Sequence, residues 1–167
     1  MSPATSPTVS RSENNIHISL TPSHLNLTST IDLIRTPKAG ALVLFAGTTR
    51  DSFDAKPVTT LSYSSYAPLA LTTIFAIASD IKTAHGLEAI AVTHRLGEVP
   101  VGEESIHIAV AARHRTEAWR AGEECLERVK EKAEIWKLEV FEDGSVWRAN
   151  RDGLKGELVE MVKGPGE

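Results

Sequence analysis

The chain has 167 residues, of which 41% are hydrophobic and 24% are charged, and its formal net charge is −4. This length and composition are typical of one globular domain, and the acidic balance argues against a general nucleic-acid binder. The single cysteine excludes an internal disulfide, no histidines have metal-ligand spacing, and no apolar run is long enough to span a membrane. We therefore expect no metal, no cofactor and no membrane partner.

The segment before the first predicted strand is rich in Ser, Thr and Pro. It lacks a positive start followed by an apolar stretch, so residues 1–15 predict a disordered tail on a cytoplasmic protein. Apolar periodicity then predicts a strand at 16–20, a helix at 28–35, a strand at 41–46, a polar loop at 48–57, a strand at 58–66 and a helix from Pro68 to His85. Pro68 suits the first turn of its helix, and Gly86 ends that helix.

The second half of the chain continues the alternation of strands and helices. The pattern predicts a strand at 87–95, a turn at 97–102, a strand at 105–112, a long helix capped by Thr116, and a hairpin of 135–141 with 145–148. Cys125 lies on the apolar stripe of that helix, so we expect a buried and unreactive thiol. The order of elements predicts one α+β domain over 16–150, with two long helices packed on a mixed sheet, followed by a charged tail at 151–167.

Three basic clusters are candidates for chemistry, and the first follows the predicted strand at 41–46. There the sequence FAGTTRD places Phe45 at the strand end and Arg50 in a glycine-containing loop. Such loops present backbone N–H groups and a guanidinium to an anion. An isolated arginine after a strand is more often simply solvated, so this cluster alone does not establish a site.

The second cluster is the run from Arg113 through His114 to Arg115, between a strand and the start of a helix. A helix N-terminus already carries partial positive charge and free N–H donors. Three further basic groups there favour an anion site. The alternative is that Glu117 and nearby acids neutralise them, and the sequence leaves both interpretations open.

The third cluster contains Lys130 and Lys137. On one continuous helix these residues would be two turns apart and share a face. We expect the helix to break before Trp136, so that the two amines converge from a helix end and an adjoining strand. The alternative is that lysines at a helix C-terminus only stabilise the helix dipole.

Several well-known catalytic motifs are absent from the sequence. It has no GxxxxGK phosphate loop, no GxGxxG after a strand and no GxSxG elbow. Nucleotide hydrolysis and serine-hydrolase chemistry therefore have no support. The basic clusters leave two hypotheses, an enzyme acting on anionic reactants and a non-catalytic anion-binding scaffold module.

Taken together, these segments resemble the large subunit of molybdopterin synthase, the MoaE family. The likeness covers roughly residues 38–150. The segments that carry it are FAGTTRD at 45–51, LSYSSY at 61–66, THRLGEVPVGE at 93–103, RHR at 113–115, KEKAEIWK at 130–137 and Trp147. Each segment is short, but six of them in this order form a specific signal.

The resemblance implies an α/β hammerhead-type fold and a homodimer of large subunits within a heterotetramer. Each large subunit would bind a small ubiquitin-like sulfur-carrier subunit, whose C-terminal thiocarboxylate enters the pocket. The implied reaction is sulfur transfer to cyclic pyranopterin monophosphate (precursor Z), which makes the dithiolene of molybdopterin in molybdenum cofactor biosynthesis. It implies no nucleic-acid partner.

The resemblance also assigns site residues. Lys130 and Lys137 match the catalytic lysines of the family. Substrate-binding positions are matched by Arg50, His114, Arg115, the pocket-wall Phe45, and Arg151, a basic residue near the neighbouring protomer's site. The chain departs from the family pattern at Ser62 and Ser64, where glutamates are usual, and at Glu134, where proline is usual.

Overall fold

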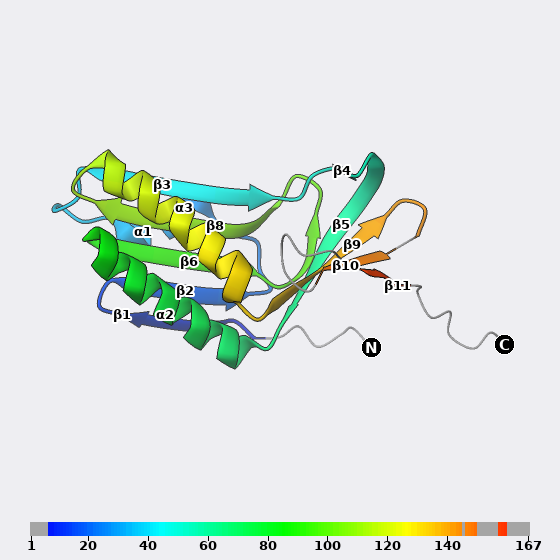
Figure 1. The fold of residues 1–167 in the computed structure, drawn as a ribbon, viewed down its shortest axis with the longest axis horizontal. Helices are drawn as coiled ribbons and strands as arrows, with labels where there is room; N and C mark the ends of the chain where they lie inside the picture. The colour runs from blue at the N-terminus through cyan, green and yellow to red at the C-terminus, as the bar shows by residue number, and fades with distance from the viewer. Residues whose placement is uncertain (1–6, 145, 150–156, 160–167) are drawn as a thin grey trace.

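Two β-sheets of unequal size form the frame of the molecule (Figure 1). The computed structural model describes residues 7–144, 146–149 and 157–159. The first sheet has five strands in the order β1 (Val9–Glu13), β2 (Ile16–Thr21), β6 (Ala89–Arg95), β8 (Glu104–Ala112) and β3 (Ala41–Thr48). Strands β2 and β6 run parallel and the other neighbours antiparallel, so this sheet is mixed.

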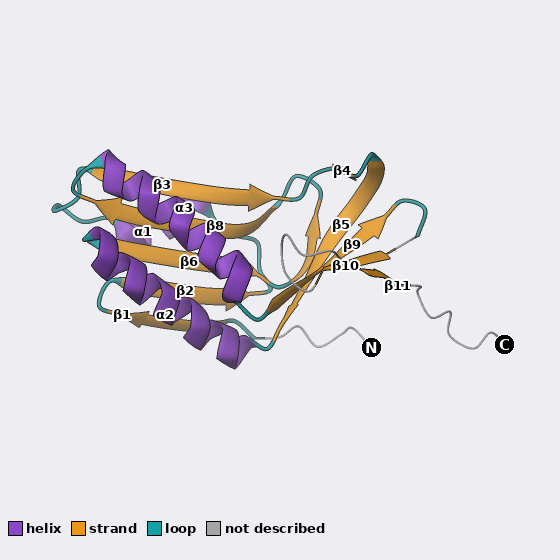
Figure 2. Cartoon of the chain, viewed as in Figure 1, coloured by secondary structure: helices purple, strands orange, loops and turns teal. Residues whose placement is uncertain are grey.

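Three helices cover the two faces of this five-stranded sheet (Figure 2). The long helices α2 (Ala67–His85) and α3 (Arg115–Lys132) lie on one face, and the short α1 (Leu27–Ile34) lies on the other. The main core lies under α2 and α3, where isoleucines and valines of the sheet are fully buried. Under α1 the sheet presents four alanines, Ala89, Ala91, Ala109 and Ala111. Such small side chains let a short helix approach the sheet closely.

The second sheet extends beyond one end of the first. Its main path is β11 (Glu157–Val159), β10 (Val146–Ala149), β9 (Ile135–Phe141), β5 (Lys56–Ser65) and β4 (Ser52–Phe53), and β7 (Gly97–Pro100) also pairs with β5. Its buried apolar cluster is small and consists of Val58, Leu61 and Phe141. The central pairing of β5 with β9 is antiparallel and places Tyr63 opposite Lys137.

Most predicted elements are confirmed, including both long helices, the mixed sheet and the hairpin of β9 with β10. The αL conformation of Gly86 ends α2 as predicted. Within the described residues, no helix is long and apolar enough to cross a membrane. The buried faces of these elements follow the apolar periodicity of the sequence, which explains why they could be predicted.

Five expectations are wrong in detail. Val9–Glu13 is a strand and not part of a disordered tail, because Asn14 and Asn15 adopt positive φ and turn the chain back onto β2. The predicted polar loop contains β4, and the predicted turn at 97–102 contains β7, since both pair with β5. The second long helix begins at Arg115, with His114 in place of Thr116 at the cap position. The single expected sheet is two sheets.

Candidate functional site

A cavity of about 500 Å³ lies where the end of β3, the C-terminal end of α3 and the second sheet meet. Four of the residues singled out from the sequence line it together: Phe45, Arg50, Lys130 and Lys137. Its apolar walls come from α3 and from both sheets, with Ile106, Leu126 and Val129 among them. The structure therefore gathers these four predicted residues around one space, although Phe45 and Lys137 are 92 positions apart in the sequence.

The two lysines reach the cavity because the chain changes direction between them. Helix α3 ends at Lys132, and Ala133 has extended backbone angles (φ −67°, ψ 141°). Two backbone hydrogen bonds stabilise the turn that follows the helix. The N–H of Ala133 donates to the carbonyl of Val129 (2.9 Å), and the N–H of Ile135 donates to the carbonyl of Ala133 (2.8 Å). Lys130 therefore projects from the last helical turn and Lys137 from β9, as the predicted helix break requires.

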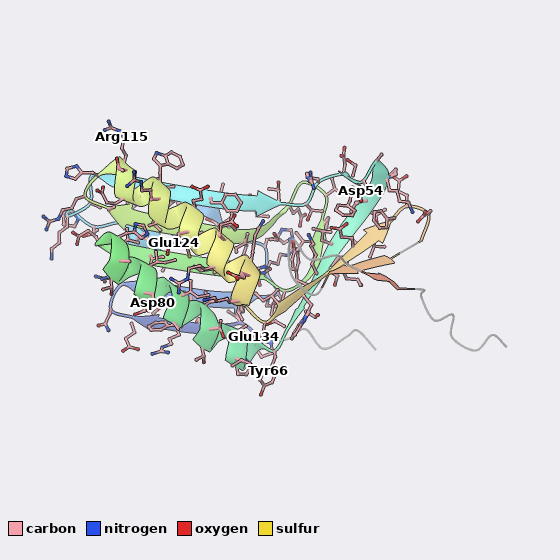
Figure 3. The ribbon with its side chains drawn as sticks, viewed as in Figure 1. Asp54, Tyr66, Asp80, Arg115, Glu124 and Glu134 are labelled. Atoms are coloured by element: carbon pink, nitrogen blue, oxygen red, sulfur yellow. The ribbon has the colours of Figure 1, made fainter. Side chains whose placement is uncertain are left out.

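Glu134 supports this turn, at a position where the resemblance implies proline. Its carboxylate accepts a hydrogen bond from Thr73 Oγ1 on α2 (2.9 Å), and its carbonyl accepts one from Ser65 Oγ on β5 (2.8 Å). Figure 3 shows Glu134 just beyond the C-terminal end of α3. Hydrogen bonds to two neighbouring elements here constrain the chain where a proline ring would otherwise do so.

The other two departures face away from the cavity. Successive side chains of a strand point to opposite faces, and on β5 the cavity-lining residues are Leu61 and Tyr63. Ser62 and Ser64 alternate with them and belong to the opposite face of the sheet. These serines therefore do not alter the charge of the cavity.

A buried carboxylate accompanies Lys137. Glu139 is only 4% exposed, and its Oε1 lies 3.4 Å from Lys137 Nζ. The two residues share one face of β9 because they are two positions apart. Among the described residues, Glu139 Oε2 has no hydrogen-bond partner. A buried charge is costly unless it is paired, so the ion pair restrains both the carboxylate and the ammonium at the cavity wall.

Sequence reasoning also missed Tyr63 and His94, which line the same cavity. Their rings meet edge to face, with centroids 4.9 Å apart. His94 Nδ1 donates to the carbonyl of Arg95 (2.8 Å), because a carbonyl oxygen can only accept. The alternation of side chains along β9 could have indicated Glu139, but nothing local in the sequence pairs Tyr63 with His94.

The wall formed by β3 depends on Gly47. A Cβ on this residue would lie 2.8 Å from Ile106 Cγ2 and 3.4 Å from the ring of Phe45. Only glycine lets the side chains of Ile106 and Phe45 pack directly against the backbone at this position. The position is next to a register shift at the end of β3. Phe45 remains 37% exposed, and Arg50 follows after the strand ends.

The cavity is cationic although the whole chain is acidic. Among the described residues, its charged lining consists of the cations Arg50, Lys130 and Lys137 and a single carboxylate, Glu139. The chain as a whole has a net charge of −4. Cations that converge in a partly desolvated hollow attract anions far more strongly than cations dispersed over the surface. The arrangement suits phosphate or carboxylate-like ligands.

His114 and Arg115 are not part of this cavity within one chain. Both are exposed and lie at the opposite end of α3 from Lys130 (Figure 3). Arg115 and Lys130 are fifteen positions apart on this helix, which is about 22 Å at roughly 1.5 Å per residue. Arg113 is paired with Glu88 (3.3 Å) and not with Glu117. Arg151 lies outside the described residues.

Cys125 takes no part in the site. It is fully buried on the face of α3 that packs on the core, and burial raises the pKa of its thiol to about 12. A thiol with that pKa is almost entirely protonated near neutral pH and is a poor nucleophile. Over the part of the chain that is described, no group of three or more His, Cys, Asp or Glu could hold a metal ion.

Comparison with known proteins places this arrangement in a family. The family model described as "MoaE protein" matches residues 20–132. Two relatives named "Molybdopterin synthase catalytic subunit" cover most of the chain. The one from Phaeosphaeria nodorum is 59% identical over 153 residues (91% of this chain and 81% of the relative). The one from Neurospora crassa is 58% identical over 159 residues (93% and 77%).

The fold has solved counterparts as well. The crystal structure of molybdopterin synthase from Staphylococcus aureus matches with a TM-score of 0.74 at 29% sequence identity. The match covers 78% of this chain and 95% of the Staphylococcus aureus chain. The family match spans more than half of the chain, and the sequence identity to these relatives is high enough to establish membership. The chain belongs to the MoaE protein family.

Proposed function

We propose that this chain acts as the catalytic subunit of molybdopterin synthase. It transfers sulfur from the C-terminal thiocarboxylate of a small ubiquitin-like carrier subunit to cyclic pyranopterin monophosphate. Two successive transfers give the dithiolene of molybdopterin, a step of molybdenum cofactor biosynthesis. The names of its relatives support this activity, and the cytoplasm is the proposed location, in keeping with the sequence.

The observation that carries the proposal is the convergence of Arg50, Lys130 and Lys137 on one cavity in an acidic chain. Both reactants are anions, a thiocarboxylate and a phosphate ester. Binding them together requires local positive charge to offset their mutual repulsion. A cavity of about 500 Å³ is within the usual range for small-molecule sites, so it has room for a pterin and a narrow peptide end.

The proposed roles follow from the chemistry of each side chain. Arg50 holds the substrate phosphate, because a guanidinium donates charge-assisted hydrogen bonds to phosphate oxygens. Lys130 and Lys137 share two tasks, which are stabilising the oxyanion formed as sulfur leaves the acyl carbon and moving protons at the pterin. Phe45 forms a wall. Glu139 keeps the Lys137 ammonium directed along the cavity wall.

A second copy of the chain supplies His114 and Arg115 in this proposal. If two copies pack their α3 helices antiparallel, Arg115 of one lies beside Lys130 of the other. The same pairing brings Trp119, which is 64% exposed, against Leu126 on the cavity rim. Trp119, Leu126 and Lys130 share one helix face by their spacing. The homodimer would then complete two sites within a heterotetramer.

The first experiment replaces Lys130 by alanine and measures molybdopterin formation with the thiocarboxylated carrier. Lys130→Ala is expected to abolish the product while circular dichroism and melting temperature stay close to the wild type, because this side chain is exposed. Lys132→Ala, also exposed but outside the cavity lining, is the matched control and keeps its activity. Full activity of Lys130→Ala would refute the proposal. Binding of both reactants by the wild type without product would favour the non-catalytic scaffold.

A complementation experiment tests the shared site. Lys130→Ala and Arg115→Ala chains, each inactive alone, are mixed under conditions that exchange subunits. In a mixed dimer one site has Lys130 from one chain and Arg115 from the other, so part of the activity returns. If both residues acted within one chain, every site of the mixture would stay defective and no activity would return.

A further inference from the structure

The segment Thr93 to Glu103, THRLGEVPVGE, has no role yet in the proposed reaction. It contributes His94 to the cavity but none of the cations. It leaves the five-stranded sheet at the end of β6, pairs with β5 through β7, and returns to the first sheet at the start of β8. The segment therefore spans the junction between the two sheets, beside the loop that carries Arg50.

A tight turn closes this segment. The N–H of Glu103 donates to the carbonyl of Pro100 (3.1 Å), and Gly102 in the third position has a φ of +84°. That combination is a type II turn, which requires glycine there because a side chain disfavours positive φ. The turn fixes where the backbone groups of Val99, Gly102 and Glu103 point.

A mostly buried ion pair anchors the turn to the first sheet. Arg95, the last residue of β6, is 8% exposed, and its Nη1 donates to Glu103 Oε2. His24 Nδ1 lies 3.5 Å from the same carboxylate oxygen. Removing either partner of a desolvated pair leaves the other without its counter-charge. The conformation of the turn is thus tied to the end of β6.

This turn holds Thr49, the residue before Arg50, in place. Thr49 is 2% exposed, and its three polar groups bond to the turn and to Val99 just before it. Its N–H donates to the carbonyl of Glu103 (3.1 Å), its carbonyl accepts from the N–H of Gly102 (2.9 Å), and its hydroxyl donates to the carbonyl of Val99 (3.0 Å). Arg50 itself is exposed and lines the cavity. The buried Thr49 therefore fixes the backbone position of Arg50, and with it the position of the Arg50 Cα.

We propose that Thr49 and the Arg95–Glu103 ion pair are positioning residues that act through Arg50. They hold its backbone in the conformation from which the guanidinium meets the substrate phosphate. An arginine on a fixed backbone loses less conformational freedom on binding than one on a mobile loop. The inference rests on the proposed function, because it takes Arg50 to be the phosphate ligand.

The test is a double-mutant cycle on substrate affinity. Thr49→Val removes the hydroxyl but keeps the shape of the side chain. It is expected to raise KM for the pterin substrate by about tenfold, with a smaller change in kcat, because displacing a binding group weakens positioning. In an Arg50→Ala background the same substitution should change KM by less than about twofold, since coupled residues are not additive. The affinity for inorganic phosphate should follow the same pattern.

Two variants separate positioning from general stability. Thr30→Val removes another buried threonine hydroxyl, which lies on α1 at the far face of the first sheet. It should lower the melting temperature without changing KM. Thr49→Ser restores the hydroxyl and should restore KM. If Thr49→Val does not fold, Glu103→Gln provides the same cycle, since its side chain is 34% exposed.

The outcomes distinguish the phosphate-binding role of Arg50 from the positioning role of Thr49. An Arg50→Ala variant with unchanged KM and phosphate affinity would overturn both the phosphate role of Arg50 and the positioning role. A large effect of Arg50→Ala with equal effects of Thr49→Val in both backgrounds would overturn only the positioning role. Coupling between Thr49 and Arg50, absent for Thr30, supports it.

Discussion

The five-stranded sheet with its helices and the second sheet differ in what they bury. The first buries a large apolar core in which Ile90, Ile108 and Val110 are completely inaccessible. The second has a small buried apolar cluster of Val58, Leu61 and Phe141, with Val99 of β7 buried as well. Next to them lies the charged pair of Lys137 and Glu139. The cavity lies at the boundary between the two regions.

This difference assigns the stability of the fold to the first region and the chemistry to the boundary between the two regions. Charged groups inside the main core would cost several kcal/mol each in lost hydration. At the boundary, Lys130 comes from the exposed end of a helix and Lys137 from the second sheet, where it is half-buried, so both stay partly hydrated. The large core can then hold the fold while the boundary carries the cations. Substitutions in the two regions should therefore affect different measurements.

The largest expected effect is on activity, from the second sheet. Lys137→Ala should lower the rate of sulfur transfer by about a hundredfold or more, the usual loss when a group that stabilises a developing charge is removed. A reconstituted assay measures this rate. Lys56→Ala is the matched control, since Lys56 is also a lysine of the second sheet, on β5, pairs with Asp143, and does not line the cavity. Equal losses in both variants would contradict the assignment.

The next effect is on stability and compares the two cores. Ile108→Ala, at a residue with 0% exposure, should lower the free energy of unfolding by an amount near the upper end of the range of about 2–5 kcal/mol. Leu61→Ala should fall near the lower end of the range of about 2–5 kcal/mol, because its small cluster can relax towards the cavity. Urea denaturation measures both. A larger loss for Leu61→Ala would reverse the comparison.

A smaller effect concerns Cys125 in the main core. Since burial raises the pKa of this thiol to about 12, a disulfide reagent at neutral pH should label it only after unfolding. Cys125→Ala should cost about 1 kcal/mol of stability, typical of a point substitution, and leave sulfur transfer intact. Rapid labelling of the native protein, followed by loss of activity, would mean that the main core also contributes to the chemistry.

The smallest expected effect is the pH dependence of stability. His107 is fully buried and bonds to Thr30 Oγ1, and burial lowers its pKa below the usual 6.5. The unfolded chain therefore binds this proton at higher pH than the folded one. The stabilising contribution is complete above about pH 6.5 and is lost as the pH falls from there towards the lower folded pKa.

Denaturation curves between about pH 7.5 and pH 5.5 measure this slope. His107→Gln should flatten it but not remove it, because burial also lowers the pKa of His17. His114→Gln, at an exposed position, serves as the control for slope. An unchanged slope in His107→Gln would show that this buried histidine does not contribute to acid sensitivity.

Local patterns in the sequence predicted a large part of the fold and some of the site. The apolar stripe of α3 and the alternation in β8 identified the faces that are buried. The expected helix break brought Lys130 and Lys137 to one cavity. Strand β1 was missed because only Val9 in it is apolar, so pairing with β2 and not burial forms this strand.

The amino-acid sequence by itself determined the helices, most strands and the identity of the basic residues, because periodicity and capping act over a few neighbouring positions. Only the tertiary structure decided which basic residues share a cavity. The register of β5 on β9 brings Tyr63 opposite Lys137 across 74 positions, whereas a rigid helix keeps Arg115 away from Lys130. Such pairings depend on long-range packing, in which whole sheets close against each other, and no local pattern encodes them.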